Sequence, residues 1–252
     1  MLDVIIGKNR IKNIDLLVFD KDGTLIDLYN YWSNMISLRA EKICDEYSLN
    51  RDKNKQALMF EMGVDLENRR LRPEGPVGLL PRAIVQKVAE SYLSQLGFVN
   101  TSDNCFKIFE EVDQTSLSLL DKFIKPIDGA IELLRDIKTK GGTTAIATTD
   151  RTKRAELAID FLNISNLIDL TIGADKVEKS KPAPDMLNLI CRKLDIVSEK
   201  AVMIGDANTD IEMGINAGFK ASIAVCSGLT PRKSLSKLTS YLVKDVSNIH
   251  IE

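Results

Sequence analysis

Histidine is almost absent from this sequence of 252 residues, which contains His250 and no other. A nucleophilic serine or cysteine commonly depends on a histidine that acts as its general base. His250 lies third from the end of the sequence, far from the motifs described below. Catalysis by a Ser-His or Cys-His pair is therefore not expected, and acid–base chemistry falls to carboxylates or lysine.

Cysteine is also scarce, and the sequence has no C-x-x-C pair. The cysteines are widely scattered: Cys44, Cys105, Cys191 and Cys226. Zinc sites and disulfide frameworks bring cysteines together at short, recognisable spacings, so neither is expected here. The pattern instead predicts free thiols in a protein of the reducing cytoplasm.

The sequence lacks an excess of either charge and lacks long apolar runs. Its 34 basic and 36 acidic residues give a formal net charge of −2, so there is no basic footprint for nucleic acid. It has no apolar run of about 18 residues to span a membrane, and Met1–Val4 does not open a secretion signal. Neither nucleic acid nor a membrane is an expected partner, and the oligomeric state is left open.

Short apolar runs followed by turn residues or carboxylates predict the strands of a sheet. These runs are Leu16–Phe19, Thr143–Thr148, Leu170–Gly173, Ala201–Ile204 and Ser222–Cys226. Helical patterns accompany the later runs at 151–162, 182–194 and 208–217, and on the face of Ile131, Leu134 and Ile137, which Gly141-Gly142 ends. Strands that alternate with helices predict an α/β fold with a Rossmann-like parallel sheet core.

Residues 30–124 show helical stripes and no comparable strand signal. The stripes are Trp32, Met35, Ile36, Ile43 and Tyr47; Ile84, Val85, Val88, Leu93 and Leu96; and Phe106, Phe109, Val112, Leu117 and Leu120. The Gly- and Pro-rich segment Gly63–Leu80 is the predicted long loop between them. We therefore expect an inserted helical domain at 30–124 in a core made of 1–29 and 125–252, with linkers near 26–30 and 123–127.

Two carboxylates follow the first predicted strand, in the run Asp20-Lys21-Asp22-Gly23-Thr24-Leu25. Like charges this close persist together when a cation lies between them or when one carboxyl keeps its proton. The end of a parallel strand is also where open α/β sheets place their ligand sites. The alternative is a solvated, aspartate-rich turn.

Three later sites also lie after predicted strands. Thr148 and Thr149 end one strand, where hydroxyls either bind an anion or cap the following helix. Lys181 precedes Pro182-Ala183-Pro184 and is either a charge for phosphate or an exposed lysine. The run Gly205-Asp206-x-x-x-Asp210 places one aspartate at a strand end and another in the first turn of the next helix.

The order of these motifs resembles the haloacid dehalogenase superfamily. The resemblance covers residues 16–29 and about 125–227 and includes Asp-x-Asp-Gly-Thr, a strand ending in Thr, Lys-Pro, and Gly-Asp-x-x-x-Asp. The insertion after the first motif resembles the helical cap of the phosphoglycolate phosphatase-like branch. The resemblance implies a phosphatase that acts on a small phosphorylated metabolite, phosphoglycolate- or sugar-phosphate-like, through an aspartyl-phosphate.

The resemblance also implies roles for the motif residues. Asp20 resembles the nucleophile, and Asp22 resembles the general acid that later acts as the base for water. Asp20, the backbone carbonyl of Asp22, and Asp206 would hold Mg²⁺. The remaining roles are phosphate binding by Thr148, Thr149 and Lys181, and support of the site by Gly23 and Asp210.

Asp22 and Thr24 favour phosphate ester hydrolysis over other reactions of the superfamily. Dehalogenases and phosphonate-cleaving relatives lack a carboxylate at the position of Asp22, and the sugar-phosphate mutases tend to have valine at that of Thr24. Phosphomutase is the second interpretation. A phospho-acceptor signalling module and a silent binding protein are further alternatives from other classes.

Two departures from the superfamily pattern also lead to expectations. Thr149 stands where relatives often have Asn or Ser, so its contact with phosphate is an open question. Lys21 should face away from both neighbouring carboxylates if the first strand continues through it. In the insertion, Arg69, Arg70 and Arg72 either bind an anionic group of the substrate or form an exposed basic loop.

Overall fold

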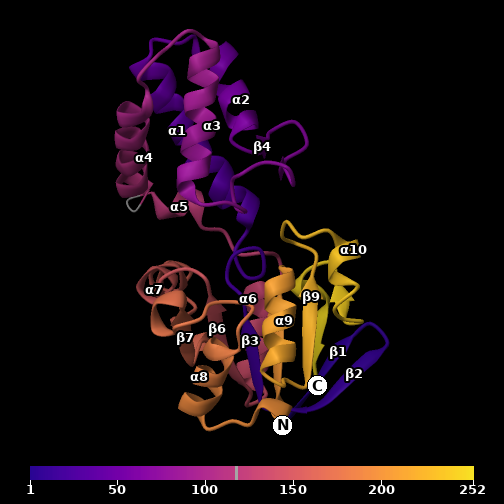
Figure 1. The fold of residues 1–252 in the computed structure, drawn as a ribbon. Coiled ribbons are helices and arrows are strands. Elements are labelled where there is room, and N and C mark those ends of the chain that lie inside the picture. Colours follow the sequence, from indigo (N-terminus) through magenta and orange to yellow (C-terminus); the bar gives the residue numbers. More distant parts are fainter. Residues whose placement is uncertain (117–118) are drawn as a thin grey trace. The chain divides into compact units, whose positions relative to one another are not determined.

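The computed structural model describes residues 1–116 and 119–252. The chain divides into a core unit, Met1–Asp27 with Pro126–Glu252, and an inserted unit, Leu28–Lys125 (Figure 1). Sequence analysis predicted that the inserted unit spans residues 30–124. In the described part of the chain, no helix is both long and apolar enough to cross a membrane.

A parallel sheet lies at the centre of the core unit, with strand order β10-β9-β8-β3-β6-β7. Its strands are β3 (Leu16–Phe19), β6 (Thr143–Thr148), β7 (Leu170–Gly173), β8 (Ala201–Gly205), β9 (Ala221–Val225) and β10 (Leu242–Val243). The chain adds β6 and β7 on one side of β3 and then β8 and β9 on the other. This reversal makes the carboxyl end of β3 a topological switch point, where such sheets bind ligands.

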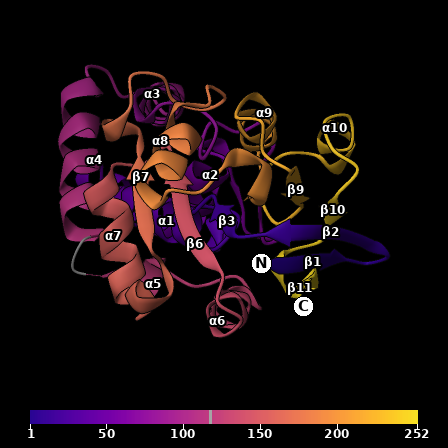
Figure 2. The same cartoon turned by 90° about the horizontal axis from the view of Figure 1, so that it is seen from below.

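Alternate residues of the strands supply two apolar layers, as the two-residue period of a strand requires. Leu17 and Phe19 pack on one face of the sheet with α6 (Ala130–Thr139). Leu16 and Val18 pack on the opposite face with α8 (Asp185–Leu194) and α9 (Asn208–Asn216). Figure 2 shows α6 on the other side of the sheet from α8 and α9. The predicted α/β fold with a helical insertion is confirmed.

The core unit contains further helices and 3-10 turns. They are α7 (Thr152–Phe161) and α10 (Arg232–Leu235), with 3-10 turns η1 (Ser165–Leu167), η2 (Ala174–Lys176), η3 (Ser198–Lys200) and η4 (Val246–Asn248). The helix predicted at 182–194 begins only at Asp185, because the segment with Pro182 and Pro184 forms the turn before it. Gly141 follows the end of α6 with φ +79°, as predicted for a glycine that ends a helix.

A small antiparallel sheet that sequence analysis did not predict joins the two ends of the chain. It has the order β11-β1-β2, with β1 (Leu2–Ile6), β2 (Asn9–Ile14) and β11 (Ile249–Ile251). The backbones of Asp3 and Glu252 exchange two hydrogen bonds of 2.9 Å. Val4, Ile11 and Ile251 bury their side chains in the same apolar layer as α6.

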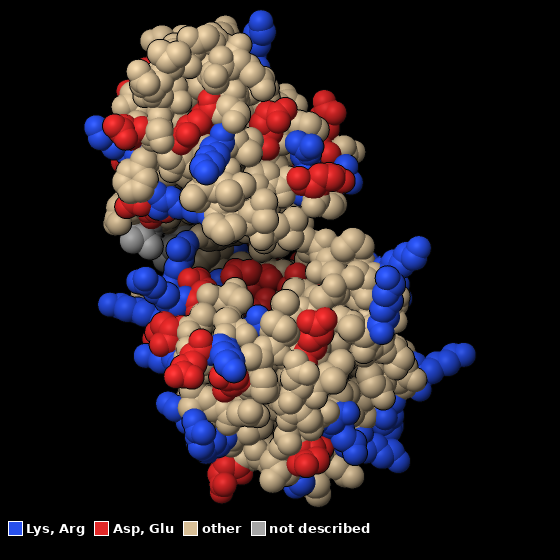
Figure 3. Space-filling model, in the orientation of Figure 1, with Lys and Arg blue, Asp and Glu red and all other residues tan. Residues whose placement is uncertain are grey.

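The inserted unit is mainly helical. Its elements are α1 (Leu28–Glu46), α2 (Arg51–Glu61), β4 (Val64–Asp65), β5 (Arg70–Leu71), α3 (Arg82–Gln95), α4 (Ser102–Ser116) and α5 (Leu120–Phe123). Sequence analysis missed α2, and the segment predicted as a loop at Gly63–Leu80 contains the β4-β5 pair. On the face of the molecule in Figure 3, basic and acidic side chains are interspersed over both units.

The predicted apolar stripes of the insertion were partly wrong. Helix α3 buries Val85, Ala89 and Leu93, which recur every four residues, so Ile84 and Leu96 fall beside that face and are exposed. In α4, Phe109 and Val112 are buried but Phe106 is exposed, beneath the guanidinium of Arg82. The predictions for Leu117 and for the side chain of Leu120 fall outside what the structure describes.

Candidate active site

Strand β3 places Asp20 at the carboxyl edge of the parallel sheet. Phe19 is in register with Ile146 of β6 and Ile204 of β8, so the residues after these strands meet at one edge. The Asp20 backbone N–H donates to the Ile204 carbonyl at 2.8 Å, which holds Asp20 against the end of β8. The Asp20 side chain is largely buried.

A tight turn follows Asp20 and brings Thr24 under the site. The Lys21 carbonyl accepts hydrogen bonds from the backbone N–H groups of Leu25 and Ile26, at 3.0 and 2.9 Å. Gly23 has φ +87°, and a Cβ there would lie 2.7 Å from the Asp206 carboxyl group. Leu25 is buried in the core, so it fixes the end of the turn. Two features therefore require a glycine in the first motif: its positive φ, and the lack of room for a Cβ beside the Asp206 carboxyl group.

Lys181 joins the first and last motifs through two ion pairs. Its Nζ lies 2.5 Å from Asp20 Oδ1 and 2.6 Å from Asp210 Oδ1, and all three side chains are almost entirely buried. The other Asp210 oxygen accepts from the Ala207 backbone N–H at 2.9 Å, which fixes this carboxylate at the start of α9. Burial alone would lower the pKa of Lys181, but the charges of Asp20 and Asp210 outweigh it and raise that pKa.

Asp206 follows β8 and is packed on several sides by small residues. Thr24 Oγ1 donates to Asp206 Oδ1 at 3.2 Å. A Cβ on Gly228 would lie 1.6 Å from Asp206 Oδ2, so the loop after β9 can approach this carboxylate only as glycine. The preceding residue, Ser227, donates from Oγ to the Gly23 carbonyl at 2.6 Å and ties that loop to the turn after β3.

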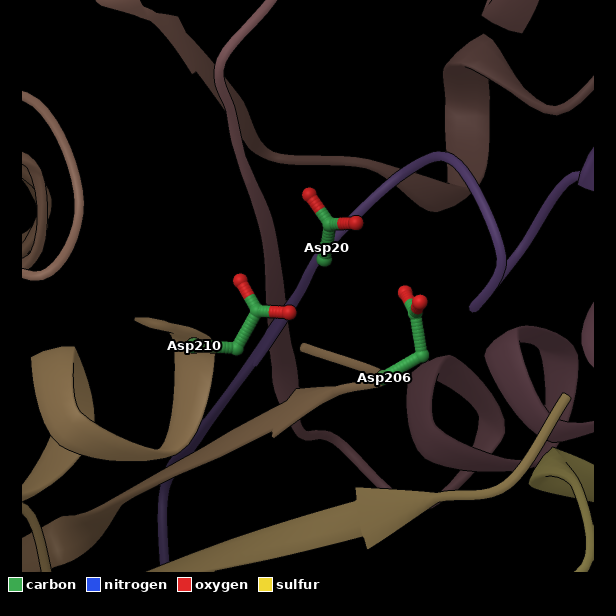
Figure 4. A group of neighbouring side chains, drawn as sticks. All are labelled: Asp20, Asp206 and Asp210. Carbon is green, nitrogen blue, oxygen red and sulfur yellow. The ribbon is translucent and has the colours of Figure 1, made fainter. Parts of the chain in front are cut away.

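Three buried carboxyl groups therefore meet at the end of the sheet (Figure 4). Asp20, Asp206 and Asp210 each offer an oxygen within 4.8 Å of the others. Burial raises the pKa of Asp20 to about 7, against the opposing charge of Lys181. Burial, followed by the charges of Asp20 and Asp210, raises the pKa of Asp206 well above its ordinary value. All three carboxylates, when ionised, would carry more negative charge than Lys181 neutralises.

The donor set of the cluster fits a hard divalent cation. Both oxygens of Asp210 already accept hydrogen bonds, from Lys181 and from a backbone N–H. Among the described residues, Asp206 accepts one side-chain hydrogen bond, from Thr24 Oγ1. Buried carboxylates with spare acceptor capacity and raised pKa values are what Mg²⁺, which takes oxygen ligands, would stabilise. Asp20 and Asp206 are accordingly the side chains suited to hold it.

The strand β6 delivers Thr148 to the same edge of the sheet. Its side chain is buried, and its Oγ1 accepts from the Asp150 backbone N–H at 3.1 Å, which leaves the hydroxyl proton to donate elsewhere. Thr149 is exposed, and neither threonine is the cap of α7, which begins at Thr152. Asp175 instead accepts hydrogen bonds from the N–H and hydroxyl of Thr152, at 2.7 and 2.8 Å.

The condition under which Lys21 was expected to face away from the carboxylates is not met. Because β3 ends at Phe19 and the chain then turns, the strand alternation does not reach Lys21. Its Nζ contacts Asp22 Oδ1 at 2.6 Å and lies 3.6 Å from Asp150 Oδ2. Burial would lower the pKa of Lys21, but the charges of Asp22 and Asp150 prevail and raise it.

The three arginines predicted as alternatives for substrate contact lie in the inserted unit. Arg69 is exposed. Arg70 Nε lies 3.2 Å from Asp65 Oδ2. Arg72 donates to the Phe60 carbonyl at 2.8 Å and stacks over the Phe60 ring at 4.0 Å. Arg70 and Arg72 therefore have partners within their own unit, and a role in substrate binding stays a prediction.

Sequence reasoning missed Ser227 and Gly228 as parts of this site. They follow β9, whose carboxyl end reaches the same edge of the sheet, so the topology alone pointed to them. Ser-Gly is also a common turn dipeptide. The sequence gives no sign of the contact between Gly228 and Asp206, since that contact depends on the packing of two strand ends.

Comparison with known proteins places this geometry in a family. The family described as haloacid dehalogenase-like hydrolase matches residues 14–218. The phosphoglycolate phosphatase of Aquifex aeolicus is 26% identical over 241 residues, which cover 94% of this chain and 99% of that protein. Pyrophosphatase PpaX of Bacillus cereus is 30% identical over 102 residues, 40% of this chain and 47% of that protein.

A solved structure shows the same fold along nearly the whole chain. A proposed beta-phosphoglucomutase from Thermotoga maritima superposes with a TM-score of 0.68 at 21% identity, covering 92% of this chain and 94% of that chain. The family match spans most of the sequence and includes the turn after β3, Lys181 and the cluster of aspartates. This chain is therefore an enzyme of the haloacid dehalogenase-like hydrolase family.

Proposed function

We propose that this chain is a Mg²⁺-dependent phosphatase that hydrolyses a small phosphorylated metabolite through an aspartyl-phosphate on Asp20. The observation that carries the proposal is the meeting of Asp20, Asp206, Asp210 and Lys181 at the switch point of the sheet. The phosphatase and pyrophosphatase names of similar proteins support phosphoryl transfer as the chemistry. The substrate class that we propose is phosphoglycolate- or sugar-phosphate-like, with no nucleic acid or membrane as partner.

The first chemical step transfers the phosphoryl group to Asp20. Lys181 holds Asp20 Oδ1, so the carboxylate is oriented for in-line attack of its other oxygen on phosphorus. The bond from phosphorus to the leaving oxygen breaks, and Asp22 protonates that oxygen. Thr148 donates its hydroxyl proton to a phosphoryl oxygen, and the ammonium group of Lys181 lowers the negative charge of the site.

The second step returns Asp20 to its free form. Asp22, now ionised, takes a proton from water, and the water oxygen attacks the phosphorus of the aspartyl-phosphate. The bond from phosphorus to the Asp20 oxygen breaks, inorganic phosphate leaves, and the proton remains on Asp22 for the next cycle. Mg²⁺, held by Asp20, Asp206 and the Asp22 carbonyl, would offset the negative charge that the phosphate meets among these carboxylates.

The test is a panel of phosphate esters with Mg²⁺, including phosphoglycolate, sugar phosphates, pyrophosphate and p-nitrophenyl phosphate. Wild type should release inorganic phosphate from at least one of them, and Asp20→Asn should abolish release while its circular dichroism spectrum stays unchanged. No release by folded wild-type protein, or full activity in Asp20→Asn, would contradict the proposal.

The same panel distinguishes the alternatives. A phosphomutase would convert a sugar phosphate to its isomer in the presence of a bisphosphate and accumulate little free phosphate. A signalling module would retain a long-lived aspartyl-phosphate after treatment with a small phosphodonor. A location in the cytoplasm, where the free thiols would stay reduced, is part of the proposal.

A further inference from the structure

Lys21 is a buried cation beside the proposed general acid, in a place where the strand pattern did not predict one. Its side chain is 7% exposed, whereas those of Asp22 and Asp150 are 34% and 23% exposed. The lysine therefore lies on the inner side of both carboxylates. A buried ammonium group is costly unless it is paired, so these two contacts are what keep it there.

The contact with Asp22 determines where that carboxyl group lies. In the described part of the chain, Lys21 is the hydrogen-bond donor to the Asp22 side chain: its Nζ donates to Asp22 Oδ1 at 2.6 Å. Among the described residues, none donates a hydrogen bond to Asp22 Oδ2. A general acid that delivers a proton to one oxygen of a substrate needs a fixed rotamer, because a small displacement of its carboxyl group lowers the reaction rate strongly.

The second contact links the turn after β3 to the loop after β6. Lys21 Nζ lies 3.6 Å from Asp150 Oδ2, and the Asp150 backbone N–H donates to Thr148 Oγ1 at 3.1 Å. Asp150 also lies 3.6 Å from Arg154 of α7. Lys21 is thus held from the opposite side by a loop that is itself fixed to a helix.

We propose that Lys21 is a positioning residue for Asp22. It holds Asp22 Oδ1 so that Oδ2 is presented to the leaving-group oxygen and, in the second step, to water. The inference rests on the proposed function, since it assigns Lys21 a task only if Asp22 is the acid and base. A merely structural Lys21 would stabilise the turn and leave the proton transfer unaffected.

The test compares two substrates that differ in how much they need an acid. An alkyl phosphate has a poor leaving group and depends on proton transfer, whereas p-nitrophenolate leaves without it. The value of kcat/KM reports phosphoryl transfer to Asp20 for both substrates. Its ratio between the two substrates does not depend on the fraction of protein that is folded.

We expect Lys21→Met to lower kcat/KM about 10²-fold for an alkyl phosphate and less than about tenfold for p-nitrophenyl phosphate, given the usual contribution of general acids. Asp22→Asn should change the ratio in the same direction, and Lys21→Met should add little to it in the Asp22→Asn background. Lys200→Met is the matched control, since Lys200 pairs with Asp15 at 3.0 Å near the opposite end of the strands.

Each outcome has a definite reading. A wild-type ratio in Lys21→Met, even with both rates reduced, would overturn the inference while the phosphatase proposal stands. An unchanged ratio in Asp22→Asn would overturn it as well, because Asp22 would not be the acid. A folded wild-type protein without turnover on either substrate would overturn both the inference and the proposed function.

Discussion

Replacing Gly228 with alanine tests the architecture of the site without removing any functional group. A Cβ at this position would lie 1.6 Å from Asp206 Oδ2 and 2.3 Å from its Cγ. Since such contacts are essentially never shorter than 3.0 Å, the carboxylate or the loop must move by roughly 1.4 Å. Gly228 is not in the left-handed region of φ, so the backbone itself accepts alanine.

The displacement predicts a large loss of activity and a modest loss of stability. A misplacement of about 1 Å at a catalytic site can cost about 10²-fold in rate, so we expect kcat/KM to fall by at least that factor. Overpacking of this kind costs about 1–3 kcal/mol in the free energy of unfolding. The Mg²⁺ concentration for half-maximal activity should rise, because Asp206 is a proposed ligand.

The assay is phosphate release against Mg²⁺ concentration, beside urea unfolding of each variant. Gly97→Ala is the control: Gly97 has φ +92°, and no atom lies within 4 Å of the place that a Cβ would take, so the change strains only the backbone. It should lose stability and keep wild-type kinetics. A folded Gly228→Ala protein with wild-type kcat/KM and Mg²⁺ dependence would refute the reasoning.

Three further predictions concern charge in the cluster. Lys181→Met should lower the free energy of unfolding, measured by urea denaturation, by about 3–5 kcal/mol and abolish turnover, because the buried Asp20 and Asp210 carboxylates lose their cation. A variant as stable as wild type would contradict this. Asp206→Asn should melt no lower than wild type in EDTA, yet lose the rise in melting temperature that Mg²⁺ causes; a retained rise would contradict Asp206 as a ligand. Burial raises the pKa of Asp20 from 3.8 to about 7, so the folded protein keeps a proton that the unfolded chain releases. In urea titrations with EDTA, the free energy of unfolding should therefore fall as the pH rises between these values, and Mg²⁺ should make this fall smaller. A free energy of unfolding that rises over this pH range would contradict the prediction.

Much of the core could be predicted from the sequence because its signals are local. The strands β3, β6 and β7 have the predicted bounds, since each is an apolar run that ends at a turn residue or a carboxylate. Both faces of β3 and of most of β6 are buried, so these strands do not need to alternate apolar and polar residues. The resemblance to the superfamily implied that the motifs after these strands form one site, and the shared carboxyl edge of the parallel strands brings them together.

The failures involve contacts that are distant in sequence or polar in composition. Strand β2 contains Arg10, Lys12 and Asn13, and its sheet is completed by the last residues of the chain, so no local pattern predicts it. Helix α2 buries only Asn54, Leu58 and Met59, which is too few to mark a stripe. In the site, Gly228 and Ser227 act through packing between separate loops, which spacing in the sequence does not encode.

The interrupted core has a consequence for how the protein is made. Strand β3 leaves the ribosome before its neighbours β6 and β8, with the whole inserted unit, residues 28–125, translated in between. The antiparallel sheet is completed later than these pairings, because β1 also pairs with residues 249–251. Domains generally fold as units during synthesis, so the insertion can become compact first, while the catalytic strand stays unpaired until β6 and then β8 have been made.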